Sequence, residues 1–256
     1  MIRSMTHFAV CVLSVLSVPC ACGQATAKLP KAEDVLDHYV AATGGKAAYE
    51  KLTNRVSRGT LDIVAANIKG KLTVTQAAPN KLTTLTDLGP VGTSRQGTDG
   101  QVVWESSTIS GERILEGEEK DTALMQAIFN GELHWQERFV KAECVAVEDV
   151  DGKPAAKILL SRKNGKPIVE YYDTASHLLV KQVITTMGPM GEMTIEQYPG
   201  DYKKFDGVLI ATSLKQKVLG QEIVLSFTDI KHNVKLPADT FALPKEIVEI
   251  QAKKAK

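Results

Sequence analysis

Residues 166–233 read KPIVEYYDTASHLLVKQVITTMGPMGEMTIEQYPGDYKKFDGVLIATSLKQKVLGQEIVLSFTDIKHN, and this stretch decides the fold. Short runs of β-branched and aromatic residues alternate in it with turn signals such as Asp206-Gly207 and Leu219-Gly220. Successive runs lie too close together for the long helical crossovers that parallel strands require. The stretch therefore predicts an antiparallel meander.

The clearest predicted strand covers residues 210–218. Its side chains alternate between a more apolar face, Ile210, Thr212, Leu214, Gln216 and Val218, and a wetter face, Ala211, Ser213, Lys215 and Lys217. A period of two is typical of a strand with one face against a core and the other toward water.

The composition bounds the class of protein. The chain has 256 residues, of which 43% are apolar and 5% aromatic, so a core would consist mainly of aliphatic side chains. It has 31 basic and 30 acidic residues. Such a balance argues against a nucleic-acid partner, because nucleic-acid binding usually requires a basic face.

The amino terminus has the pattern of a secretory signal peptide. Arg3 precedes an apolar run over residues 8–18, and the small residues Ala21-Cys22-Gly23 follow. The run is too short to span a bilayer as a helix. We therefore expect residues 1–23 to be removed and the mature protein to be periplasmic. The alternative is a lipid-anchored form at Cys20 or Cys22, although Pro19 fits poorly with the sequence required before a lipidated cysteine.

The first testable prediction concerns this processing. Cleavage is expected between Gly23 and Gln24, without acylation, because the charged, apolar and small segments follow one another in the order that signal peptidase requires. The intact mass of protein from the envelope fraction measures it. A mature amino terminus at Cys20 or Cys22 that carries fatty acids would contradict the prediction.

The mature chain is predicted to form a single domain over residues 24–243. Helices are expected over residues 30–43 and 46–52, followed by strands, with Asp99-Gly100 as a two-residue hairpin turn and Trp104 as a buried anchor. A helical insertion between residues 116 and 140 divides the sheet into two halves. Residues 244–256 are expected to be a flexible Lys-rich tail.

Catalytic and metal-binding motifs are missing from the sequence. It has no Gly-x-Ser-x-Gly elbow, no His-Glu-x-x-His and no phosphate-binding loop. The four histidines of the mature chain are scattered without ligand spacing: His38, His134, His177 and His232. Cys144, which the signal peptide leaves as the one cysteine, is expected to be a buried, inert thiol. The sequence therefore predicts a protein that is not an enzyme and has no cofactor or metal.

Two groups of residues, in this order along the chain, resemble a known family. They are Leu29-Pro30, Val35-Leu36-Asp37, Tyr39-Val40, Ala42-Thr43-Gly44-Gly45, Ala48-Tyr49, Gly97, Asp99-Gly100, Trp104, Gly111 and Arg113, and then Tyr172-Asp173, Leu178-Leu179-Val180, Asp201-Tyr202 and Phe205-Asp206-Gly207-Val208. The pattern is similar to that of the LolA/LolB-like outer-membrane lipoprotein-sorting proteins, which are exported bacterial proteins. The resemblance implies a mainly β fold: a strongly curved antiparallel half-barrel, plugged by helices, that encloses an apolar cavity for acyl chains.

Two segments are candidates for ligand contact. The first is the inserted helix, which places apolar residues at helical spacing, and the second is a hairpin rich in methionine, a residue that adapts to variable apolar shapes. Their candidate residues are Leu124, Met125, Ile128 and Phe129 in the helix, and Met187, Met190 and Met193 in the hairpin. In the alternative interpretation, the helix packs as ordinary core and the methionines fill gaps.

These features favour a carrier or binding protein for lipid, lipoprotein acyl chains or another hydrophobic ligand. Its partners would be a lipid or an acylated protein, with the envelope membrane surface or a membrane protein as a further contact. Two alternatives stay open: a structural or sensor module that binds a protein partner, and a hydrolase whose Ser-His-Asp triad assembles from distant positions.

Overall fold

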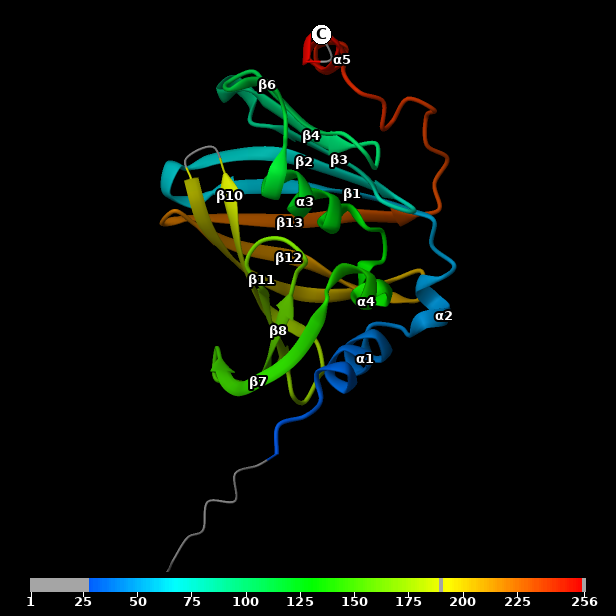
Figure 1. Cartoon of the computed structure of the whole chain (residues 1–256), viewed down its shortest axis with the longest axis vertical. Coiled ribbons are helices and arrows are strands. Elements are labelled where there is room, and N and C mark those ends of the chain that lie inside the picture. Colours follow the sequence, from blue (N-terminus) through cyan, green and yellow to red (C-terminus); the bar gives the residue numbers. More distant parts are fainter. Residues whose placement is uncertain (1–27, 189–190, 255–256) are drawn as a thin grey trace, which may run out of the picture.

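The computed structural model describes residues 28–188 and 191–254 (Figure 1). Most of these residues form one antiparallel sheet of 13 strands. The strands are β1 (Asn54–Ile63), β2 (Ile68–Ala77), β3 (Lys81–Asp87), β4 (Thr93–Thr98), β5 (Val103–Ser107), β6 (Gly111–Ile114), β7 (Lys141–Val150), β8 (Lys153–Ser161), β9 (Ile168–Asp173), β10 (Leu179–Gly188), β11 (Gly191–Phe205), β12 (Val208–Val218) and β13 (Gln221–His232). The helices are α1 (Ala32–Ala42), α2 (Lys46–Tyr49), α3 (Gly117–Ala127), α4 (Trp135–Arg138) and α5 (Lys245–Lys254).

The order of the strands shows how the sheet is built. It runs β6-β5-β4-β3-β2-β1-β13-β12-β11-β10-β9-β8-β7. The first and last strands therefore pair in the middle of the sheet, while β6 and β7 form its two edges. The sheet curls around α3 and α4 without closing into a barrel (Figure 1). The predicted fold class is confirmed.

The pairing of β1 with β13 contains an irregularity at Gly59. The register shifts between Arg58 and Gly59, and a Cβ atom placed on Gly59 would lie 1.9 Å from the carbonyl oxygen of Ser226. Only a residue without a Cβ atom lets the two backbones approach so closely. Gly59 is therefore a structural requirement of the central strand pair.

The turns follow the predicted chemistry, with one correction. At Asp206-Gly207 both residues have positive φ, 48° and 95°, as a tight two-residue hairpin requires. The expectation of a two-residue turn at Asp99-Gly100 is wrong, because residues 99–102 all lie between β4 and β5. The side chain of Asp99 accepts hydrogen bonds from the backbone N–H groups of Gln101 and Val102, both at 2.9 Å, and thereby stabilises the longer loop.

The insertion between the two edge strands crosses the inner face of the sheet, where α1, α3 and α4 pack. Its helix α3 ends at Ala127, two residues earlier than predicted, so Ile128 and Phe129 are not helical. Ile128 adopts an extended ψ of 115°, and the backbone N–H of Phe129 donates to the carbonyl oxygen of Pro79 at 2.9 Å. A long-range hydrogen bond thus takes the place of a further helical turn.

Two arginines tie α3 to opposite halves of the sheet. Arg113 of β6 lies 2.7 Å from both Glu105 and Glu119. On the other side, the buried side chain of Arg162 donates to Thr122 Oγ1 at 2.8 Å and to the carbonyl oxygen of Thr185 at 3.1 Å. Such charge-assisted hydrogen bonds are stronger than neutral ones. They hold α3 across the opening between the edges.

The core consists of two clusters. The larger joins α1 to β8, β9 and β10 and has the members Ala32, Leu36, Phe139, Ala156, Ile158, Leu160, Ile168, Tyr172 and Ile184. The smaller contains Tyr49, Leu52, Phe129 and Val208. Trp104, which is 1% exposed, is buried as predicted.

The carboxyl-terminal segment differs from its prediction. Residues 245–254 form the helix α5 beside the edge strand β6 (Figure 1), where a flexible tail was expected. Ile247 is completely buried, and Lys254 Nζ lies 2.7 Å from Glu116. Burial of Ile247 stabilises the helical form of this Lys-rich segment, and the helix lies beside an edge strand of the sheet. None of the described helices is long and apolar enough to cross a membrane.

Candidate functional site

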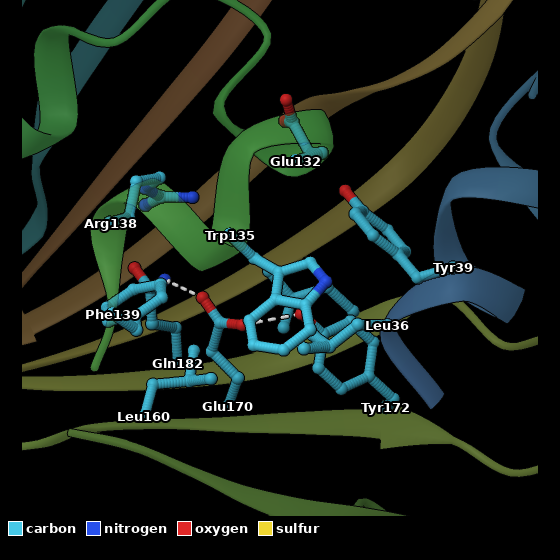
Figure 2. A pocket seen from close by; sticks show the side chains of 11 residues that line it. Leu36, Tyr39, Glu132, Trp135, Arg138, Phe139, Leu160, Glu170, Tyr172 and Gln182 are labelled. Atoms are coloured by element: carbon cyan, nitrogen blue, oxygen red, sulfur yellow. Dashed lines mark hydrogen bonds between the residues drawn. The ribbon is translucent and has the colours of Figure 1, made fainter. Parts of the chain in front are cut away.

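A cavity of about 130 Å³ lies on the inner face, between α1, α4 and strands β8 to β10. We call it the aromatic cavity. Its lining residues are Leu36, Tyr39, Glu132, Trp135, Arg138, Phe139, Leu160, Glu170, Tyr172, Leu179 and Gln182. Figure 2 shows side chains from the helices and from the sheet converging on this space.

Four aromatic side chains surround the cavity. Tyr39 comes from α1, Trp135 from α4, Phe139 from the residue after α4, and Tyr172 from β9 (Figure 2). The rings of Tyr39 and Tyr172 meet edge to face, with centroids 5.2 Å apart. The whole chain has only two tryptophans, six tyrosines and six phenylalanines, so four in one cavity is a marked concentration.

The floor of the cavity carries a buried carboxylate. Glu170 is 6% exposed, and each of its oxygens accepts one hydrogen bond. The Tyr172 hydroxyl donates to one oxygen at 2.5 Å, and the Gln182 amide donates to the other at 2.6 Å (Figure 2). Burial raises the pKa of Tyr172, and the neighbouring Glu170 raises it further, so this hydroxyl keeps its proton and continues to donate.

The upper part of the cavity contains Glu132 and Arg138 (Figure 2). The Arg138 guanidinium lies over the Phe139 ring, 5.0 Å from its centroid, and its Nη1 donates to the carbonyl oxygen of Gly131 at 3.2 Å. Its Nε is buried, and no described residue accepts a hydrogen bond from it. The lining therefore combines two carboxylates with one guanidinium.

A second hollow adjoins the aromatic cavity at Arg138, which lines both. This α3 hollow has a volume of about 200 Å³. Its lining residues are Asp121, Leu124, Met125, Ile128, Glu137, Arg138, Arg162, Lys163 and Asn164. Three of the residues predicted from the sequence, Leu124, Met125 and Ile128, are thus brought together in its lining.

The other predicted site residues have different surroundings. Phe129 is buried in the smaller core cluster and also borders a third hollow near Leu52 and Pro79. Met187 is exposed, and neither Met187 nor Met193 lines the cavities described above. Met190 lies outside the described residues. Ligand contact by this hairpin stays a prediction.

The four described histidines do not come together in one group, although two of them are neighbours. The rings of His38 and His177 are 4.8 Å apart, His134 contacts Glu137, and His232 contacts Asp206. Over residues 28–188 and 191–254, no group of three or more potential metal ligands is found. The Cys144 thiol is half-buried rather than buried as predicted, and this partial burial raises its pKa, which makes it a poorer nucleophile.

The aromatic cavity is not apparent from the sequence. Its members come from three segments that are far apart in the chain, and only short-range signals could have pointed to them. Leu36 and Tyr39 share one face of α1, and Glu170 and Tyr172 share one face of β9. A glutamate on the inner face of a strand is such a signal, because a charge there needs a partner.

Comparisons with known proteins identify the fold. Neither a protein-family model nor a curated protein matches the sequence. Among solved structures, a DUF1329 family protein from Desulfovibrio piger has a TM-score of 0.56 and 12% identity, covering 82% of this chain and 97% of that one. A structure described as an outer membrane lipoprotein-sorting protein domain, from Vibrio parahaemolyticus, has a TM-score of 0.56 and 12% identity. The match covers 85% of this chain and 99% of that one. A LolA superfamily protein from Nitrosomonas europaea has a TM-score of 0.55 and 11% identity, and the match covers 84% of this chain and 98% of that one. The resemblance drawn from the sequence is confirmed as a likeness of fold, and the chain has the curled, open sheet of the LolA superfamily structures.

Proposed function

We propose that this protein is an exported, non-enzymatic carrier or binding protein for a lipid or another hydrophobic ligand in the bacterial envelope. The observation that carries the proposal is the pair of adjoining spaces on the inner face, the aromatic cavity and the α3 hollow. The name of the Vibrio parahaemolyticus structure, which refers to lipoprotein sorting, agrees with this reading. A lipid or an acylated protein would be the cargo, delivered to or taken from the envelope membrane.

The α3 hollow suits the apolar part of such a ligand. Leu124, Met125 and Ile128 offer aliphatic surface, and burial of an alkyl chain stabilises a complex by about 0.8 kcal/mol per CH₂ group. Ligand pockets usually have volumes of about 300–1,000 Å³. The hollow of about 200 Å³ is smaller, so a long chain requires the insertion to move outward. The contacts of α3 with Arg113 and Arg162 are the ones that such a movement would break.

The chemistry of the lining supports binding rather than catalysis. Burial raises the pKa of both Tyr39 and Tyr172, which makes these hydroxyls weaker acids. The Glu170 carboxylate is occupied by two hydrogen-bond donors and is not poised against a nucleophile. The arrangement orients and holds a polar group.

A charged substitution in the α3 hollow tests the proposal. Ile128→Asp is expected to weaken binding of an apolar ligand at least about tenfold, because an unpaired carboxylate resists transfer out of water. The measurement is saturable binding of the uncharged fluorophore N-phenyl-1-naphthylamine, with folding verified by circular dichroism. Val140→Asp is the matched control, since Val140 is 70% exposed and lines neither space.

Two outcomes would count against the assignment. If the wild-type protein shows no saturable binding, the carrier proposal fails, and the structural or sensor module takes its place. If Ile128→Asp folds and binds as tightly as Val140→Asp, the ligand site lies outside the α3 hollow. Native mass spectrometry of protein purified without detergent adds an independent measurement, in which a co-purified lipid is expected.

A further inference from the structure

We propose that the aromatic cavity binds an alkylammonium group, so that the ligand of this protein is an organic cation with an apolar tail. The binding of an apolar tail rests on the proposed carrier function, whereas the binding of the ammonium head group does not. It follows from three properties of the cavity: its rings, its charge and its size.

The rings provide the surroundings that a cation prefers. Tyr39, Trp135 and Tyr172 lie around one small space, and the faces of such rings attract ammonium groups, most strongly where water is excluded. The cavity already contains one example of this interaction, since the Arg138 guanidinium lies over the Phe139 ring. Because Arg138 already lies over Phe139, the rings that would meet a ligand are those of Trp135, Tyr39 and Tyr172, and the last two also contact each other edge to face.

The charge of the cavity points the same way. Glu170 is buried, yet the groups that donate to it, Tyr172 and Gln182, are both neutral. Among the described residues, no lysine, arginine or histidine nitrogen lies within 4 Å of Glu170 or of Glu132. A buried carboxylate is costly unless a positive charge compensates it. A ligand ammonium would supply that charge, whereas a ligand carboxylate would be repelled by Glu170.

The size of the cavity limits what enters it. An apolar cavity of about 150 Å³ accommodates benzene. The aromatic cavity, at about 130 Å³, is therefore suited to a group of similar bulk, such as trimethylammonium, and not to an entire lipid. A tail attached to this group would pass Arg138 into the α3 hollow, because Arg138 lines both spaces.

The test is calorimetric titration with three probes that share a 12-carbon chain. The two ionic probes are kept below their micelle concentrations, and dodecanol is kept below its solubility limit. Dodecyltrimethylammonium is expected to bind at least about tenfold more tightly than dodecanol or dodecanoate, as cation–π and charge contacts in a desolvated site allow. Tetramethylammonium lacks the tail, so its affinity shows whether the site takes a small free cation or requires a cation with an apolar tail. It is expected to bind more weakly than dodecyltrimethylammonium.

Variants assign the preference to the cavity. Glu170→Gln is expected to lower the affinity for dodecyltrimethylammonium about tenfold and to change that for dodecanol much less, because the substitution removes the negative charge and keeps the shape of the side chain. A general loss of structure would instead weaken both. Trp135→Leu, at a half-buried position, provides a second variant if Glu170→Gln does not fold. Glu33→Gln, on the exposed surface of α1, is the control and is expected to bind like the wild type.

The outcomes separate this inference from the proposed function. If the three 12-carbon probes bind equally, or if dodecanoate binds most tightly, the cation site is overturned while the carrier proposal stands. If tetramethylammonium binds and none of the 12-carbon probes does, the cation site stands and the carrier proposal fails. If no probe binds, both are overturned. Equal loss of dodecanol and cation binding in Glu170→Gln and Trp135→Leu would also overturn the inference.

Discussion

Replacing Trp104 by alanine is expected to lower the free energy of unfolding by about 3–5 kcal/mol, the range for truncating a large buried aromatic side chain. Trp104 is 1% exposed and is among the largest fully buried side chains of the protein. Its ring packs against Gly97, where an added Cβ atom would lie 3.2 Å from Trp104 Cζ2, and Arg95 lies over it at 5.3 Å. The substitution would leave a cavity that the surrounding strands cannot fill.

Denaturant-induced unfolding measures this effect, with Trp104→Phe as the matched variant. Trp104 Nε1 is buried and has no hydrogen-bond partner among the described residues. Phenylalanine would therefore lose volume but no hydrogen bond, and it is expected to destabilise the protein less than alanine does. An alanine variant within about 0.5 kcal/mol of the wild type would show that the ring does not support the core.

A second large effect is expected at Gly59. Gly59→Ala should lower the free energy of unfolding by about 3 kcal/mol or more. Adding a group to a well-packed core usually costs about 1–3 kcal/mol, and this contact is closer than most. The added Cβ atom would lie 1.9 Å from the Ser226 carbonyl oxygen and 2.7 Å from its carbonyl carbon. Backbone atoms cannot rotate away as a side chain can, so β1 and β13 would have to separate.

Gly200→Ala is the control for the Gly59 variant. Gly200 also lies within a strand, β11, and a Cβ atom added there would meet nothing within 4 Å. Alanine at this position is expected to change the stability by less than about 1 kcal/mol, with stabilisation favoured because the unfolded chain loses freedom. Similar unfolding midpoints for the two variants would contradict the steric argument.

The fold was largely predictable because its signals are local. The alternation of apolar and polar side chains along residues 210–218 can be recognised from this segment alone. Asp206-Gly207 indicates a tight turn because both residues readily adopt positive φ. The errors occurred where distant contacts decided the local structure. Phe129 leaves the helix for a hydrogen bond to Pro79, and Ile247 orders a segment whose composition suggested a flexible tail.

The candidate site was predictable only in part. Leu124 and Met125 lie in the last turn of α3 and Ile128 follows it directly, so their nearness along the chain already brings them to one hollow. The aromatic cavity requires Tyr39, Trp135 and Tyr172, which come together only when α1, α4 and β9 are folded. The periodicity of one segment gives no information about contacts between distant segments, so this part of the site can be recognised only from the folded structure.

The pairing of β1 with β13 also bears on when the protein can fold. These two strands are the sixth and seventh of the sheet, yet they are the first and last to be synthesised. Hairpins on either side can form as soon as their strands emerge, but the two halves cannot join until β13 is available. A chain from which β13 has not yet emerged therefore lacks the central strand pair of its native sheet. Until that strand pairs with β1, the sheet consists of two halves that no backbone hydrogen bond joins.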